Sequence, residues 1–308
     1  MLSSTLNRAS RSARARRAVE GLPVTRRVVD RFVAGEHVPD AVAAAQQLRD
    51  GGRSVTIDVL GEDVADVAGA RATRDAYLNL LFALHEAGSA DGSDVSVKLS
   101  ALGQALPGSG ADLATVHARQ ICTAAAAVGC TVTLDMEDHT TVDATLATGA
   151  ALRGEFPQIG NVLQSSLERT PGDIAALSTS GARIRLVKGA YREPASVAHQ
   201  RKSEVDRAYL ADIDALMRSG CYPMIATHDP RMIARAAAAA RECGRTPEGW
   251  ELQMLYGIRT DLQERAVAAG QQMRVYVPFG ADWYGYFMRR LAERPANVAF
   301  FLRAMSRR

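Results

Sequence analysis

The sequence predicts an α/β fold in which eight parallel strands, each followed by a helix, close into a (β/α)8 TIM-type barrel. Eight short runs rich in β-branched residues recur along the chain, and Ala-rich helical stretches lie between them. No GxGxxG or GxxxxGK[ST] motif occurs, which argues against an open dinucleotide-binding sheet. A chain of 308 residues is long enough for such a barrel, which typically needs roughly 250.

The predicted strands are short and evenly spaced, and each leads into a polar or Gly-containing loop. They are expected at residues 54–61, 95–100, 131–136, 161–166, 182–189, 223–228, 251–256 and 274–280. The clearest helices are expected at residues 113–128, 203–218, 230–243 and 260–269. Asp112 and Asp229 are the predicted N-caps of the first and third of these, and Pro230 suits a first helical turn.

Two regions are predicted: a helical N-terminal arm over residues 1–50 and a catalytic barrel over residues 51–308. The arm carries a basic stretch between Arg8 and Arg17 in an Ala/Ser background. A solvated first helix is the expected reading of this stretch, and contact with anionic lipid or a transit peptide is the alternative.

The composition narrows the class of protein. Hydrophobic residues make up 47% and charged residues 23%, as in soluble globular proteins, and the net charge of +3 is too weak to favour nucleic-acid binding. The four cysteines show no CxxC spacing, so neither a zinc framework nor disulfides are expected. No apolar run approaches the roughly 20 residues that span a bilayer. We therefore expect a cytoplasmic protein, at most peripheral to the inner face of a membrane.

Polar residues concentrate at the predicted strand ends, where barrel enzymes carry their chemistry. Alternation along the strands turns Lys98, Asp135 and Arg185 away from their apolar neighbours and into the barrel. Buried charges must pair with each other or with a ligand, because isolated ones cost too much free energy. An ion network that only stiffens the barrel is the structural alternative to a functional site.

Three kinds of site fit these residues. A metal hydrolase would use Asp135, Glu137 and His228, although the six histidines are scattered. A Schiff-base lyase would use Lys98 or Lys188 as its nucleophile. A cofactor oxidoreductase would use the Arg and Lys side chains to hold phosphates and to tune a redox ring.

Seven motifs in order along residues 50–308 resemble the catalytic barrel of monofunctional proline dehydrogenases. They are VSVKLSALG with Lys98, TLDMED with Asp135, NVLQSSLERT with Gln164, IRLVKGAYREP with Arg185, IATHDP with Thr227 and His228, WELQMLYGIR with Gln253, and YFMRRLAER near the C-terminus. One position departs from the pattern, since Arg192 stands where some relatives carry Trp.

The resemblance implies an FAD-dependent oxidation of L-proline to 1-pyrroline-5-carboxylate, the first step of proline degradation to glutamate. It implies a membrane quinone as the electron acceptor and is compatible with peripheral membrane contact and with a homo-oligomer. The implied cofactor contacts are Met136, Gln164, Arg185, Val187, Lys188, Gly189, Ala190, Thr227, His228 and Gln253. The implied catalytic residues are Asp135, Arg185 and Tyr276, and the implied substrate contacts are Lys98, Tyr286, Arg289, Arg290 and Glu293.

The C-terminal segment supports the implied substrate on physical grounds. Arg289 and Arg290 fall in a predicted helix that begins near Asp282 and lies over the barrel mouth, and paired guanidiniums suit a carboxylate. Tyr286 offers an aromatic face to a small apolar ring, and Glu293 lies four residues after Arg289. Three alternatives stay open: the same chemistry on hydroxyproline, a non-flavin enzyme that uses Lys98 and Asp135, and a barrel without activity. Asp135 could act as a base or only tune the site.

Overall fold

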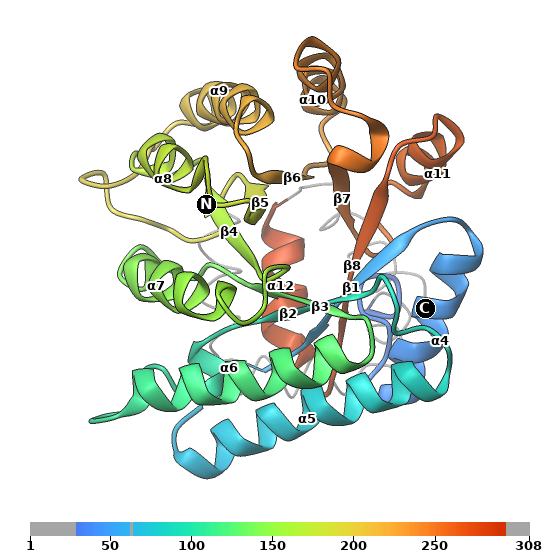
Figure 1. Cartoon of the computed structure of the whole chain (residues 1–308), viewed down its shortest axis with the longest axis vertical. Helices are drawn as coiled ribbons and strands as arrows, with labels where there is room; N and C mark the ends of the chain where they lie inside the picture. The colour runs from blue at the N-terminus through green and yellow to red at the C-terminus, as the bar shows by residue number, and fades with distance from the viewer. Residues whose placement is uncertain (1–28, 62–63, 294–308) are drawn as a thin grey trace, which may run out of the picture.

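Eight parallel strands form a closed barrel in which the last strand pairs with the first. The computed structural model describes residues 29–61 and 64–293, with side chains up to Met288. Figure 1 shows the strands at the centre and helices around them. The (β/α)8 fold that the sequence predicts is therefore confirmed.

Each strand begins within one residue of its predicted start and ends one to three residues before its predicted end. The strands are β1 (Ser54–Val59), β2 (Asp94–Val97), β3 (Thr131–Leu134), β4 (Gly160–Gln164), β5 (Arg183–Val187), β6 (Tyr222–Ala226), β7 (Glu251–Leu255) and β8 (Met273–Phe279). The predicted runs included polar residues that follow the strands. These residues lie in the loops at the C-terminal ends, where a barrel builds its site.

The helices that cover the barrel are α4 (Val38–Asp50), α5 (Val67–Glu86), α6 (Gly110–Ala127), α7 (Val142–Arg153), α8 (Thr170–Leu177), α9 (Lys202–Arg218), α10 (Pro230–Glu242) and α11 (Thr260–Ala268), with short 3₁₀ turns η1 (Ser100–Leu102) and η2 (Pro247–Gly249). The Asp229 side chain caps α10 by accepting from Arg231 N, as predicted. The predicted cap at Asp112 is wrong, because α6 begins earlier, with Ser109 at the N-cap position. Asp112 lies in the first turn, and carboxylates are favoured at both positions, so residue type alone did not separate them.

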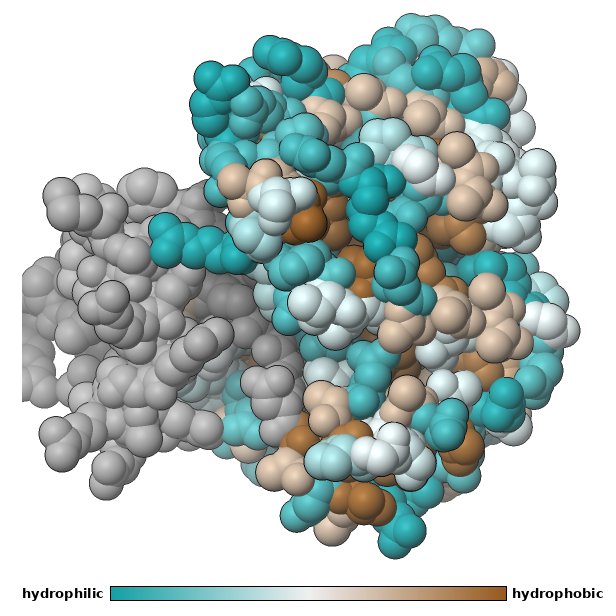
Figure 2. Space-filling view, turned by 90° about the vertical axis from the view of Figure 1, so that its left-hand side faces the viewer, coloured by the Kyte–Doolittle hydropathy of each residue, from teal (hydrophilic) through white to brown (hydrophobic). Residues whose placement is uncertain are grey.

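The hydrophobic core lies between the outer face of the barrel and the helices. Val55 of β1 packs in one buried cluster with Leu80 of α5, and Ile184 of β5 packs in another with Ile213 of α9. Figure 2 shows the side that carries α7 and α8, where small hydrophobic areas alternate with hydrophilic ones. Within the described residues, no helix is long and apolar enough to cross a membrane.

Helix α4 comes from the predicted N-terminal arm and packs directly on the barrel. Its Ala41 and Ala45 are fully buried in the same cluster as Val55 of β1 and Val275 of β8. Small side chains let the helix approach the sheet closely. Residues 1–28, including the basic stretch, lie outside the described residues.

Helix α12 (Trp283–Glu293) follows β8 and lies at the C-terminal end of the barrel. The chain leaves β8 through Gly280, whose φ of 128° favours glycine. The ring centres of Phe287 on α12 and Phe32 are 6.4 Å apart. Both residues belong to a buried cluster with Leu60, which directly follows β1. In Figure 1, α12 projects onto the centre of the ring of strands, in agreement with the predicted helix over the mouth.

Candidate active site at the C-terminal ends of the strands

Two groups of charged side chains fill the barrel interior. The inner cluster comprises side chains at or near the strand starts, namely Asp94, Arg183, Glu251 and Arg274. The mouth cluster lies toward the C-terminal ends and comprises Asp58, Lys98, Asp135 and Tyr276. Arg185, in the middle of β5, contacts members of both clusters.

Asp94 is the main acceptor of the inner cluster and is fully buried. It accepts hydrogen bonds from Thr56 at 3.0 Å and Thr133 at 2.9 Å, and Arg183 Nη1 lies 3.1 Å from its Oδ1. Burial alone would raise the pKa of this carboxyl, but Arg183, Arg274 and Arg185 outweigh it and lower the pKa to about 2. Asp94 is therefore an anion across the working pH range.

Four acceptors fix the guanidinium of Arg185. Its Nη1 donates to Asp135 Oδ1 at 2.6 Å and to Ser96 Oγ at 2.8 Å. Its Nε donates to Gln253 Oε1 at 2.7 Å, and its Nη2 lies 3.4 Å from Asp94 Oδ2. Charge-assisted bonds on several donors hold a guanidinium in one orientation, so Arg185 is a preorganised positive charge.

The structure brings the predicted Lys98, Asp135 and Arg185 together at the mouth. The Tyr276 hydroxyl donates to Asp135 Oδ2 at 2.8 Å, and the Arg185 guanidinium lies 5.3 Å from the centre of the Tyr276 ring. Lys98 Nζ is 3.0 Å from both carboxylate oxygens of Asp58 and 3.9 Å from Asp135 Oδ2. These hydrogen bonds and ion pairs link side chains from five strands or strand ends, β1, β2, β3, β5 and β8, into one group.

Burial perturbs two groups of the mouth cluster. It raises the pKa of Asp58, which the charge of Lys98 opposes and that of Asp135 reinforces. It also raises the pKa of Tyr276 well above its ordinary value, and the Asp135 and Asp58 charges act in the same direction. The Tyr276 phenol therefore stays protonated and serves as a hydrogen-bond donor.

The loops after β4 and β5 form a cradle beside this cluster. Gly189 has a φ of 107°, and a Cβ at this position would lie only 2.1 Å from Ser166 Oγ. Ser166 Oγ is buried and has no hydrogen-bond partner among the described residues. Gln164 donates from Nε2 to the Glu137 carbonyl at 2.8 Å. The glycine must stay bare because Ser166 packs against it, and the buried hydroxyl without a partner fits a bound group at this edge.

The other predicted cofactor contacts lie along the same strand ends. Lys188 Nζ is 2.5 Å from Asp206 Oδ1 on α9, and His228 Nε2 accepts from the Leu255 amide at 3.0 Å. Thr227 Oγ1 accepts from the Asp229 amide at 3.1 Å. Met136 and Val187 contribute to one apolar cluster, whereas Ala190 is exposed.

Gln253 is buried and both ends of its amide are engaged. The oxygen accepts from Arg185, and Nε2 donates to Glu251 Oε1 at 2.6 Å. The predicted direct contact between Gln253 and a cofactor stays a prediction, and these two hydrogen bonds make Gln253 a support for Arg185.

The predicted substrate residues on α12 are only partly described. Tyr286 is buried in the cluster that joins α12 to residues 29–33 and Leu60. Arg289, Arg290 and Glu293 belong to α12, but their side chains lie outside the described residues. Their roles in substrate binding stay predictions.

Three buried acids were missed from the sequence: Asp58, Asp94 and Glu251. A signal existed, because Asp94 and Ser96 precede Lys98 at two-residue intervals and so share its face of the strand. Glu251 has the same relation to Gln253. The predicted second strand began at residue 95, which left Asp94 outside it.

The geometry weighs against two of the alternative chemistries. The Lys98 ammonium is held by both oxygens of Asp58, an arrangement that stabilises the charged form, whereas a Schiff-base nucleophile must be neutral. The proposed hydrolase ligands have other partners: Asp135 binds Arg185, and Glu137 accepts from the Ser100 amide at 3.1 Å. In the part of the chain that the structure describes, no group of three or more His, Cys, Asp or Glu side chains could hold a metal ion.

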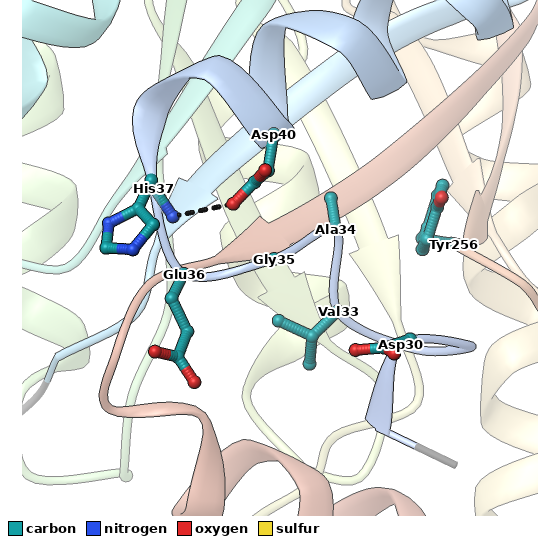
Figure 3. Close-up of a pocket in the computed structure, with 8 residues that line it drawn as sticks. All are labelled: Asp30, Val33, Ala34, Gly35, Glu36, His37, Asp40 and Tyr256. Atoms are coloured by element: carbon teal, nitrogen blue, oxygen red, sulfur yellow. Dashed lines mark hydrogen bonds between the residues drawn. The ribbon is translucent and has the colours of Figure 1, made fainter. Parts of the chain in front are cut away.

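A cavity of about 270 Å³ lies beside the start of α4 (Figure 3). Three carboxylates line it, from Asp30, Glu36 and Asp40, together with the Tyr256 ring. Asp40 Oδ2 accepts from the His37 amide at 3.0 Å and so contributes to the start of α4. No member of the mouth cluster lines this cavity, which separates it from the candidate site.

Comparison with known proteins gives a consistent result over most of the chain. A family model for proline dehydrogenase matches residues 41–303. The proline dehydrogenase of Deinococcus radiodurans is 43% identical over 280 residues, which cover 90% of each chain. Proline dehydrogenase 1 of Bacillus subtilis is 38% identical over 281 residues, or 91% of each chain.

Solved structures show the same barrel inside longer chains. A crystal structure of proline utilization A from Bdellovibrio bacteriovorus, inactivated by N-propargylglycine, superposes with a TM-score of 0.80 at 25% identity. The match covers 87% of this chain and 33% of the solved one, so this chain spans about a third of that protein.

Proposed function

The chain belongs to the proline dehydrogenase family, and from this premise we propose that it oxidises L-proline to 1-pyrroline-5-carboxylate with bound FAD. The observation that supports this most is the group of Lys98, Asp135, Arg185 and Tyr276 at the strand ends, in which Arg185 and Tyr276 are hydrogen-bonded to Asp135 and Lys98 forms an ion pair with it. It offers cations for a carboxylate and a fixed guanidinium beside the place where a redox ring would lie.

The residues present fit FAD at this edge. The absence of a side chain at Gly189 lets this loop pack directly against Ser166, and Ser166 Oγ offers the cofactor an unused hydrogen-bonding group. Met136, Gln164, Val187, Lys188, Ala190, Thr227 and His228 would complete the binding surface. FAD supplies the hydride acceptor when bound. The positive charge of Arg185 would favour the reduced, anionic form of the ring.

The substrate would be held by its charged ends. Lys98, Arg289 and Arg290 would bind the proline carboxylate, and Tyr276 and Tyr286 would contact the pyrrolidine ring, with Glu293 paired to Arg289. The amine must lose its proton before a hydride leaves the carbon next to nitrogen. Both oxygens of Asp135 already accept hydrogen bonds, from Arg185 and Tyr276. We therefore infer that Asp135 orients the site and is not an obligate base.

The electron acceptor is proposed to be a membrane quinone, which the protein would reach by peripheral contact with the membrane. A homo-oligomer is compatible with this proposal. Hydroxyproline is the second candidate substrate, since Tyr276, proposed to contact the ring, would meet a ring substituent. The deciding experiment is reduction of a soluble quinone analogue by the purified protein with proline or hydroxyproline. Yellow protein with absorbance near about 450 nm and proline-dependent turnover would support the proposal. Colourless protein that takes up no FAD would refute it.

Arg289→Met tests the substrate clamp. Loss of one guanidinium partner should raise the Michaelis constant for proline at least about tenfold while the spectrum of bound FAD stays unchanged. Arg265→Met, which removes an exposed guanidinium from α11, is the matched control and should leave the constant unchanged. An unchanged Michaelis constant in Arg289→Met would contradict the clamp.

A further inference from the structure

A chain of hydrogen bonds runs from the inner cluster to Arg185 through two neighbouring side chains of β7. Glu251 and Gln253 lie two residues apart, so both point into the barrel, and each is only 3% exposed. Glu251 Oε1 accepts from Gln253 Nε2 at 2.6 Å, and Gln253 Oε1 accepts from Arg185 Nε at 2.7 Å.

The orientation of the Gln253 amide decides whether Arg185 has an acceptor. The oxygen and nitrogen of a side-chain amide have nearly the same shape, so packing alone does not distinguish the two orientations. In the reversed orientation, the amide NH₂ would face the Arg185 Nε–H, and the two donors would repel each other. A neighbouring group that can only accept hydrogen bonds binds the amide NH₂ and not the amide oxygen, and so selects one orientation of the Gln253 amide.

Glu251 is such a group and is itself firmly held. Arg274 Nε donates to its Oε1 at 2.8 Å, and Tyr222 lies 3.4 Å from its Oε2. Burial raises the pKa of Glu251, but Arg274 and its hydrogen bond outweigh burial and lower the pKa overall. Glu251 is thus an anion that accepts and does not donate.

We propose that Glu251 is a positioning residue: by accepting from the Gln253 amide it turns the amide oxygen toward Arg185 and fixes the guanidinium at the barrel mouth. Among the described residues, Glu251 contacts Gln253, Arg274 and Tyr222 but no member of the mouth cluster, so it acts on Arg185 through Gln253. The consequence for catalysis rests on the proposed function, because it requires the flavin to lie beside Arg185.

Two substitutions of Glu251 separate the effect of its side-chain length from the effect of its charge. Glu251→Asp keeps the charge opposite Arg274 but withdraws the carboxylate by one C–C bond, about 1.5 Å, which breaks the contact with Gln253. Glu251→Gln removes the charge but keeps an oxygen at the same distance from Gln253, and Arg274 Nε, which donates to that position, keeps the oxygen and not the NH₂ group facing Gln253. We expect Glu251→Asp to release Arg185 and Glu251→Gln to keep it in place.

The first readout uses the protein without FAD or proline. Nuclear magnetic resonance of ¹⁵N-labelled arginine side chains should show the Arg185 Nε–H protected from exchange in the parent protein and in Glu251→Gln. Arg185→Lys assigns the signal. In Glu251→Asp the exchange should be at least about tenfold faster, because the acceptor is no longer fixed.

The second readout is the midpoint potential of bound FAD, which should shift in Glu251→Asp and stay at the parent value in Glu251→Gln. Proline-dependent kcat/KM should follow it, with a loss of about tenfold in Glu251→Asp. If proline fails to reduce FAD in the parent protein, the proposed function fails while the exchange measurement still tests Glu251.

Three patterns of Arg185 Nε–H exchange would overturn the inference. Both variants could keep the protection of the parent, or both could lose it. Loss of protection in Glu251→Gln alone would mean that the charge of residue 251, and not the length of its side chain, matters. Gln253→Asn is the further variant if either substitution prevents folding. It keeps an amide too short to span from Glu251 to Arg185, so retained Arg185 protection there would also overturn the inference.

Discussion

Asp94→Asn perturbs the inner cluster with little change in shape, because asparagine keeps one side-chain oxygen as an acceptor. Asp94 is fully buried and faces Arg183, Arg185 and Arg274. The substitution therefore removes one negative charge from among three guanidiniums and leaves the packing of the barrel in place.

The size of the effect follows from the pKa of the carboxyl. A fall from the ordinary 3.8 to about 2 on folding stabilises the folded state by about 2 kcal/mol at neutral pH, since one pKa unit is worth about 1.36 kcal/mol. Breaking a buried ion pair from one side typically costs about 3–5 kcal/mol, because the partner stays buried without compensation. We expect Asp94→Asn to lower the free energy of unfolding by about 2–5 kcal/mol.

The pH dependence has a definite sign. Because the pKa of Asp94 is lower in the folded state, its stabilising contribution is complete above the unfolded value of 3.8 and is lost as the pH falls toward 2. The gap in stability between the parent and Asp94→Asn should therefore narrow on acidification. Near about pH 3, the charge contribution should be about half of its neutral value.

Urea unfolding followed by tryptophan fluorescence measures the gap at each pH. Asp91→Asn, an exposed substitution in the loop before β2, is the matched control and should change stability by less than about 0.5 kcal/mol. An Asp94→Asn gap below about 0.5 kcal/mol at neutral pH, or one that widens on acidification, would refute the assignment of Asp94 as the central anion.

Two further substitutions test the mouth of the barrel. Gly189→Ala should lower FAD affinity about tenfold or more, because a φ of 107° is strained for any side chain and the new Cβ would collide with Ser166 Oγ. Titration with FAD measures the affinity. Gly181→Ala, at a φ of 67° with nothing within 4 Å of the new Cβ, is the control and should keep parent affinity. Lys98→Met should destabilise the protein, and more at about pH 8 than at about pH 5. Burial already raises the pKa of Asp58, and loss of the Lys98 ammonium raises this pKa further. The folded variant therefore binds a proton at Asp58 that is lost as the pH rises, which lowers its stability at the higher pH. Urea unfolding at both pH values measures this, and a loss independent of pH would contradict the pairing of Lys98 with Asp58.

Local patterns in the sequence were sufficient to predict the barrel and to place Lys98, Asp135 and Arg185 on its inner side. The two-residue period of the strands separated Lys98 and Arg185 from their outward-facing neighbours, and the recurrence of strand and helix gave the topology. Both depend on short stretches of chain, where residue type constrains backbone and burial directly. Asp112 shows the limit of this approach, since aspartate suits both the N-cap of a helix and the first turn, where Asp112 lies three residues after the N-cap Ser109.

Only the tertiary structure decided which charges pair. Asp58 and Lys98 are 40 residues apart, and Asp94 and Arg185 are 91 apart, so neither contact leaves a trace in local spacing. Closure of the barrel brings the inner faces of β1, β2, β5 and β7 around a common axis. The pairs then follow from the depth of each side chain along that axis. The sequence by itself determined that charges must lie inside, and the closed sheet determined that Arg185 is the residue linking the inner cluster to the mouth.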